Sequence, residues 1–179
     1  MCGRGRPDAR GIPGILGPVK GEGTLTMSTV TPFQTVGPYW SIGLRAGLEH
    51  LPSDHPGPPI IIRGRLIDGA GIGIPDGLLE WWHPALPCVQ RSPTENAGSF
   101  SIETLKAPHL AIRVLGRGIL TQYVTRLYFA DDPGLDTDPV LQLVPPHRRH
   151  TLLAQPTAPG EYAFDVVVQG DNETVFFET

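Results

Sequence analysis

Glycine and proline interrupt this chain so often that turns and short strands are favoured over long helices. The 179 residues include 22 glycines and 20 prolines, and both residue types break helices and mark turns. Between these turn residues lie short segments rich in β-branched and aromatic side chains, which favour strands. About seven such segments with frequent turn signals between them predict an all-β protein, an antiparallel β-sandwich.

The expected strands are all short. They lie within residues 60–75, 78–84, 98–105, 109–116, 120–130, 161–170 and 173–177, and the first range is expected to hold two strands around a glycine-rich turn. A short helix is expected within residues 138–154, broken by Pro145-Pro146. Alternation is clearest around residue 112, where Leu110, Ile112 and Val114 share one face of the expected strand.

Composition excludes two classes of partner. The net charge of −4 argues against nucleic acid, because phosphate-binding domains are usually basic. No uninterrupted apolar run approaches the roughly 18 residues of a membrane-spanning helix. Cys2 and Cys88 are the only cysteines, too few for a disulfide framework, so we expect a reduced, cytoplasmic protein.

Two parts of the chain differ in character. Residues 1–26 lack both hydrophobic periodicity and aromatic side chains, so we expect a disordered or artefactual N-terminal extension. Residues 27–179 are expected to form a single β-sandwich domain. Its first part, from Thr31, combines prolines with aromatic residues and predicts an extended arm.

His109 raises the question of a metal site. Two histidines separated by one residue on a strand lie on the same face, roughly 6 to 7 Å apart at their Cα atoms, and can share a metal. Here the second position is Ala111, which cannot ligate. From the residues alone, His109 is either half of a lost metal site or an ordinary strand histidine with a structural hydrogen bond.

Two arginines follow on the same expected strand face, Arg113 and Arg117. A guanidinium offers a fixed fork of donors that suits a carboxylate. Arg117 stands between two glycines, where its side chain can project into a cleft; the alternative is a surface ion pair.

Trp81 and Trp82 should face opposite ways, one in the core, and Glu80 should pair with an arginine.

Five segments together resemble the intradiol ring-cleavage dioxygenases. They are TPFQTVGPYWSIGL (31–44), GRLIDGAGIGIPDGLLEWWHP (64–84), APHLAIRVLGRGILTQYVTRLYFADD (107–132), RRHTLLA (148–154) and GDNETVFFE (170–178). The resemblance is strongest to the alpha subunit of those two-chain members that cleave 3,4-dihydroxybenzoate. It implies the β-sandwich of this family with an extended N-terminal arm.

The resemblance also implies how the chemistry is divided between chains. Catalytic chains of the family hold ferric iron with two tyrosines and two histidines, and ferric iron suits such ligands. His109 aligns with the first histidine, Ala111 replaces the second, and no tyrosine lies between Glu80 and His109. The expectation is a chain with no catalytic residue and no metal, its His109 vestigial, paired with a beta subunit that carries Fe(III) in an αβ hetero-oligomer.

Substrate contacts are implied for Thr35, Gly37, Pro38 and Arg117. The implied reaction opens the dihydroxybenzoate ring with O2 to give 3-carboxy-cis,cis-muconate. Two alternatives remain: a stand-alone β-sandwich that serves as a binding or scaffold module, and a subunit of an intradiol enzyme for another catechol. The near-complete TPxQTxGPY arm favours a subunit over a scaffold.

Overall fold

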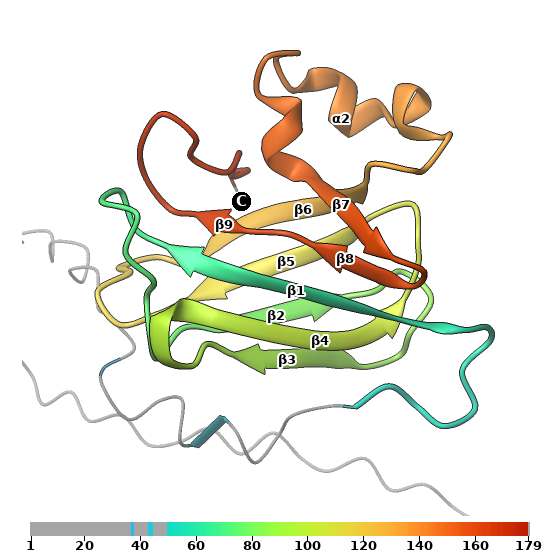
Figure 1. The fold of residues 1–179 in the computed structure, drawn as a ribbon, viewed down its shortest axis with the longest axis horizontal. Coiled ribbons are helices and arrows are strands. Elements are labelled where there is room, and N and C mark those ends of the chain that lie inside the picture. Colours follow the sequence, from blue (N-terminus) through green and yellow to red (C-terminus); the bar gives the residue numbers. More distant parts are fainter. Residues whose placement is uncertain (1–36, 38–42, 45–49, 179) are drawn as a thin grey trace, which may run out of the picture. The chain divides into compact units, whose positions relative to one another are not determined.

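Short strands dominate the structure (Figure 1), a computed structural model that describes Gly37, Gly43, Leu44 and residues 50–178. Within these residues the strands are β1 (Pro59–Ile67), β2 (Leu78–Trp82), β3 (Val89–Pro93), β4 (Ser99–Leu105), β5 (Leu110–Leu115), β6 (Tyr123–Phe129), β7 (Leu153–Ala158), β8 (Glu161–Ala163) and β9 (Val166–Val167). The helix α2 (Pro139–Leu143) is short and ends before Pro145. No helix in this part of the chain is long and apolar enough to cross a membrane.

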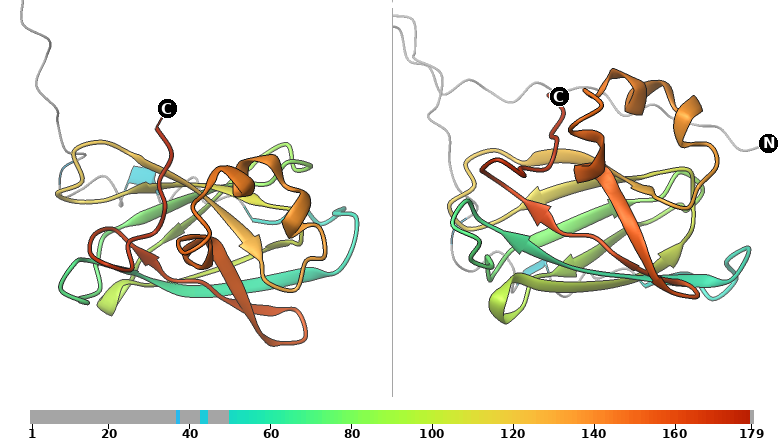
Figure 2. Two further views of the ribbon diagram at one scale, coloured as in Figure 1. Left: turned by 90° about the horizontal axis from the view of Figure 1, so that it is seen from above. Right: turned by 45° about the horizontal axis from the view of Figure 1, so that its top comes forward.

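The strands form two facing layers. The first has the order β3-β2-β5-β6 and the second β7-β8-β1-β4, and in Figure 1 the second lies in front of the first; Figure 2 shows the pair from above. Two residue pairs of β6 and β7 connect the layers along one side. The predicted all-β sandwich is confirmed, and the structure adds parallel pairing of β1 with β8 and β9 and of β6 with β7.

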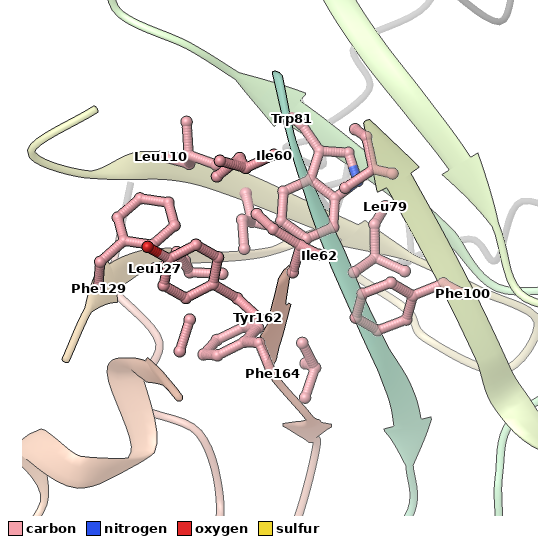
Figure 3. Close-up of a cluster of buried hydrophobic side chains, with 14 of the residues drawn as sticks. Ile60, Ile62, Leu79, Trp81, Phe100, Leu110, Leu127, Phe129, Tyr162 and Phe164 are labelled. Carbon is pink, nitrogen blue, oxygen red and sulfur yellow. The ribbon is translucent and has the colours of Figure 1, made fainter. Parts of the chain in front are cut away.

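The core lies between the layers (Figure 3). Leu110, Ile112 and Val114 are fully buried, as the alternation on β5 predicts. Trp81 is 1% exposed and packs against Phe100 with ring centres 5.7 Å apart. Burial of one such large apolar side chain stabilises the fold by about 1.5–3 kcal/mol.

A polar bridge nearly closes the sheet on the side opposite β6 and β7. The side chain of Gln90 on β3 is 2% exposed. It donates to the Glu103 carbonyl at 2.7 Å and accepts from the Thr104 hydroxyl at 2.7 Å, both on β4. These bonds satisfy a buried amide and hold the two edge strands together without a backbone ladder.

Some expected strands are absent or shorter. After β1 the chain makes a turn, and Gly73 forms only an isolated bridge to Ile67. The prediction of a second strand within residues 60–75 is therefore wrong. Residues 173–177 likewise contribute one bridge, from Phe177 to Val124. β3 and most of β7 were not expected. Residues 1–26, the proposed extension, lie outside the described residues.

Candidate functional site

Three loops meet at the end of the sandwich where β1 finishes. They follow β1 (residues 68–77), β5 (116–122) and β9 (168–178), and all three lie at the same end in Figures 1 and 2. Between them is an open groove of about 770 Å³, which we call the three-loop groove. Its lining residues are Asp68, Ile74, Arg117, Gly118, Ile119, Tyr123, Val168, Gln169, Glu173 and Phe176.

Arg117 is the cation of the three-loop groove. β5 ends at Leu115, so the expectation that Arg117 lies on the strand face is wrong. It sits instead in a tight turn closed by a bond from the Ile119 amide to the Gly116 carbonyl at 3.1 Å, with Gly118 at φ 85°. A positive φ is favourable for glycine, which explains the flanking residue.

The Arg117 guanidinium has no carboxylate partner among the described residues. Asp68 lies in the same groove, but its Oδ1 atom accepts from the Ala70 and Ile72 amides at 2.9 and 2.8 Å. The alternative prediction, that Arg117 forms a surface ion pair, is therefore wrong for the described part of the chain. A guanidinium left with open donors can bind an anionic group that enters the groove.

An aromatic stack forms one wall of the groove. Tyr123 and Phe176 stack with ring centres 4.8 Å apart and planes inclined by 28°, and Ile74, Ile119 and Val168 pack beside the same core. Sequence reasoning missed this pair because Phe176 reaches β6 only through the fold of the C-terminal segment. An arginine beside an aromatic wall suits a planar aromatic carboxylate.

The arm residues are mostly outside the described part of the chain. Gly37 has φ 79°, a conformation that favours glycine. Thr35 and Pro38 lie outside the described residues. Their contact with substrate, and that of Gly37, stays a prediction.

His109 precedes β5 and packs against an aromatic ring. Its ring centre lies 5.9 Å from that of Tyr128, and its Nδ1 atom has no hydrogen-bond partner within the described residues. The structural hydrogen bond expected for this histidine is therefore not made at Nδ1. Burial, aided by the charge of Arg126, lowers the pKa of His109.

The surroundings of His109 do not fit ferric iron. Within the described residues no three His, Cys, Asp or Glu side chains gather as metal ligands. Burial raises the pKa of Tyr128 to about 12, and its hydroxyl donates to Asp138 at 3.0 Å. A neutral, bonded phenol beside an arginine and a lone imidazole is a poor site for a trivalent cation.

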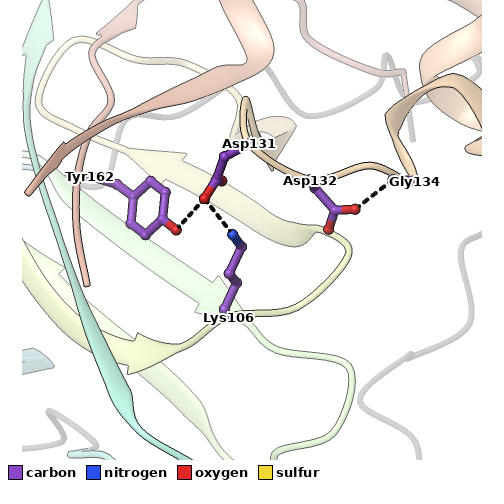
Figure 4. Close-up of polar contacts among 5 residues, drawn as sticks. All are labelled: Lys106, Asp131, Asp132, Gly134 and Tyr162. Carbon is purple, nitrogen blue, oxygen red and sulfur yellow. Dashed lines mark hydrogen bonds and ion pairs between the residues drawn. The ribbon is translucent and has the colours of Figure 1, made fainter. Parts of the chain in front are cut away.

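The opposite end of β1 carries a different cation cluster (Figure 4). Lys106 forms an ion pair with Asp131 at 2.8 Å, and the Tyr162 hydroxyl donates to the same carboxylate at 3.0 Å. Burial opposes the Lys106 charge and is the largest single influence, but the interactions with Asp131 and Tyr162 together outweigh it and raise the lysine pKa. Lys106 in turn is the main cause of the lowered pKa of Asp131. This cluster ties together segments far apart in the sequence.

Other predicted contacts on the first layer are confirmed. Glu80 pairs with Arg91 at 2.9 Å. Trp81 is in the core, whereas Trp82 on the opposite face is 42% exposed.

Two curated proteins are similar to this chain over most of its length. The protocatechuate 3,4-dioxygenase alpha chain of Burkholderia cepacia is 34% identical over 200 aligned residues, covering 86% of this chain and 100% of that one. The alpha chain of the same name from Pseudomonas putida is 33% identical over 192 residues, covering 83% and 96%. No protein-family model matches the chain.

Solved structures share the fold. The dioxygenase domain of a dioxygenase and carbohydrate-binding fusion protein from Streptomyces sp. SirexAA-E superposes with a TM-score of 0.51 at 24% identity, covering 78% of this chain and 98% of that one. The 3-chlorocatechol 1,2-dioxygenase of Rhodococcus opacus 1CP gives 0.53 at 20% identity, covering 67% and 65%. At these identities the likeness establishes the architecture.

Proposed function

Because the chain belongs to the family of protocatechuate 3,4-dioxygenase alpha chains, we propose that it forms part of the substrate pocket for protocatechuate, 3,4-dihydroxybenzoate, in an αβ enzyme. The observation that carries this proposal is Arg117, whose guanidinium has no carboxylate partner in the described residues and lines an open groove. The substrate carboxylate would supply the missing anion. A charge-assisted bond of this kind fixes both the position and the orientation of a planar ring.

Iron is assigned to the partner in this proposal. The described residues offer His109 without a second histidine, since Ala111 stands two residues later, and they gather no metal-ligand group. A beta chain with the full ligand set would bind Fe(III) and the two substrate hydroxyls. The ring would then open with O2 between the hydroxylated carbons to give 3-carboxy-cis,cis-muconate.

The alpha chain's own contribution is binding and exclusion of water. Arg117 holds the carboxylate, and the stacked Tyr123 and Phe176 provide an apolar boundary beside it. Thr35, Gly37 and Pro38 of the arm are proposed to contact the substrate as well. Fixed geometry in a dry site can lower the barrier substantially without any catalytic residue on this chain.

The proposal places the assembly in the cytoplasm. Its basis is the low cysteine content, with Cys88 a free thiol, and the nature of the reaction, which consumes a small aromatic acid. Nucleic acid is not proposed as a partner, because the chain has a net charge of −4. A membrane is not proposed either, because the sequence has no uninterrupted apolar run of about 18 residues.

Co-expression with the candidate beta chain tests the function. The purified pair should contain about one iron per αβ unit, show tyrosinate-to-iron absorption and consume O2 with protocatechuate. This chain purified alone should contain no stoichiometric iron and lack that absorption. Stoichiometric iron in the isolated chain, or a pair that binds iron but leaves protocatechuate untouched, would contradict the proposal.

A further inference from the structure

The outer face of the first layer carries a compact cationic surface. Strand register aligns Trp82, Ala111 and Arg126 in one row across β2, β5 and β6. The neighbouring row aligns Arg91, Glu80 and Arg113 across β3, β2 and β5. Adjacent strands are about 4.8 Å apart, so these side chains are neighbours. We call this set the cationic face.

Trp82 is the apolar centre of the cationic face. It remains 42% exposed on a strand paired on both sides, and its row neighbours Val89 and Ala111 are too small to cover it. The Arg113 guanidinium carbon lies 5.1 Å from the Trp82 ring centre, a cation–π contact. Tryptophan and arginine held together on a rigid strand are the residues most enriched at binding hot spots.

The charge of the cationic face opposes that of the whole chain. It contains three arginines and one glutamate, and Glu80 is already bonded to Arg91 at 2.9 Å. Arg113 and Arg126 form no ion pair with any carboxylate of the described residues. The chain as a whole has a net charge of −4. A local excess of positive charge on an acidic protein favours a negatively charged partner surface.

We propose that the cationic face docks an acidic segment of the iron-bearing partner chain, with a carboxylate between Arg113 and Arg126 and an apolar side chain against the Trp82 ring. The proposal rests on the proposed function only in naming that chain as the partner. It adds a contact separate from the three-loop groove, because Arg117 lies beyond the end of β5. The breadth of the face, four strands, fits a protein surface better than one small molecule.

Affinity measurements on the two-chain complex test the docking. The dissociation constant of the pair is measured by sedimentation velocity at low and high salt for Trp82→Ser, Arg113→Glu and Arg126→Glu. Each should weaken pairing by about tenfold or more, and the loss for the charge reversals should shrink at high salt. Arg63→Glu is the matched control, since Arg63 is an exposed arginine on the other layer.

The outcomes distinguish failure of the docking proposal from failure of the proposed function. If the pair forms with an unchanged dissociation constant in all three folded variants, the docking proposal is overturned and the proposed function stands. If the wild-type chains do not pair at all, both are overturned. If protocatechuate alone quenches the tryptophan fluorescence of the isolated wild-type chain but not that of Trp82→Ser, the face is a small-molecule site and protein docking is wrong. Melting temperatures identify any variant that fails to fold, and Arg113→Gln then replaces the reversal.

Discussion

The two ends of the β-sandwich each carry a cationic side chain, but only one of the two is paired with a carboxylate. At the start of β1, Lys106 is bonded to Asp131 and lies over the Phe129 and Tyr162 rings at 5.4 and 5.3 Å. At the end of β1, Arg117 lines an open groove without a carboxylate partner in the described residues. A cation paired with a carboxylate of its own chain contributes to the fold, whereas one with open donors can bind a ligand.

The exposure of apolar side chains also differs between the two ends. Ile72 and Leu120, on two of the loops that border the three-loop groove, are 64% and 57% exposed. Around Lys106 the aromatic rings of Phe129 and Tyr162 are buried in the core. We therefore expect substitutions at the Arg117 end to change activity and those at the Lys106 end to change stability.

Arg117→Ala should produce the largest effect on activity. In the αβ enzyme it removes a charge-assisted hydrogen bond to the substrate carboxylate, which costs about 1.5–3 kcal/mol. The expected loss is about 10- to 150-fold in kcat/KM for protocatechuate, mainly through KM, with little change in melting temperature. Steady-state O2 uptake measures it, and Arg63→Ala on the other layer is the control.

Catechol gives the decisive comparison for Arg117, because it lacks the carboxylate. Arg117→Ala should leave catechol turnover nearly unchanged. Equal losses with catechol and protocatechuate would mean that the arginine does not contact the carboxylate. If the variant has normal activity and a lower melting temperature, Arg117 stabilises the fold as Lys106 does, and the two ends do not differ in function.

Asp131→Asn should lower stability and leave activity unchanged. The change breaks the ion pair with Lys106 and weakens the bond from Tyr162, and because both ions are partly exposed the cost is about 1 kcal/mol in the free energy of unfolding. Urea denaturation measures it. Tyr162→Phe, which removes only the hydroxyl, is the matched control and should cost less. A fall in kcat/KM at unchanged stability would contradict the assignment.

The Asp131 contribution should also depend on pH with a definite sign. Lys106 lowers the pKa of Asp131 from its usual value of 3.8, so the native state favours the ionised carboxylate. The stabilisation is complete above that usual value and is lost as pH falls through the lowered native pKa. The stability difference between wild type and Asp131→Asn should therefore disappear in strong acid.

Much of this fold could be predicted from the sequence, because hydrophobic and polar residues alternate cleanly along the core strands. Leu110 and Ile112 point inward and Ala111 and Arg113 outward, and this pattern was legible without a structure. β3 was missed for a physical reason: its inward residues are Gln90 and Ser92. Both are buried and bonded, Ser92 to the Trp81 indole at 2.8 Å, so the strand has no hydrophobic period to read.

The candidate site was only partly predictable. Two glycines marked Arg117 as unusual, and the structure gives Gly118 the positive φ that such a turn requires. The stacked Tyr123 and Phe176 were not predictable, because 52 intervening residues separate them and only the completed fold brings them together. Local conformation can be inferred from neighbours in sequence, whereas a groove made by three loops cannot.

His109 offers a smaller effect, at neutral to mildly acidic pH. Burial and the charge of Arg126 lower its pKa from 6.5, so the folded state resists protonation that the unfolded chain accepts. Stability should fall as pH drops below the usual value and level off below the native pKa. His109→Gln should flatten this part of the profile, measured by urea denaturation at each pH. An unchanged profile in His109→Gln would contradict the prediction.

Removal of residues 1–26 should have the smallest effect of all. The segment contains no aromatic residue and no hydrophobic period, so we expect its apolar surface to be too small to offset the entropy of ordering it. Truncation should therefore leave the melting temperature, pairing and kcat/KM unchanged. A loss of activity at unchanged melting temperature would contradict the prediction and show that these residues contribute to function. A large drop in melting temperature would contradict it too and show that they contribute to the stability of the fold.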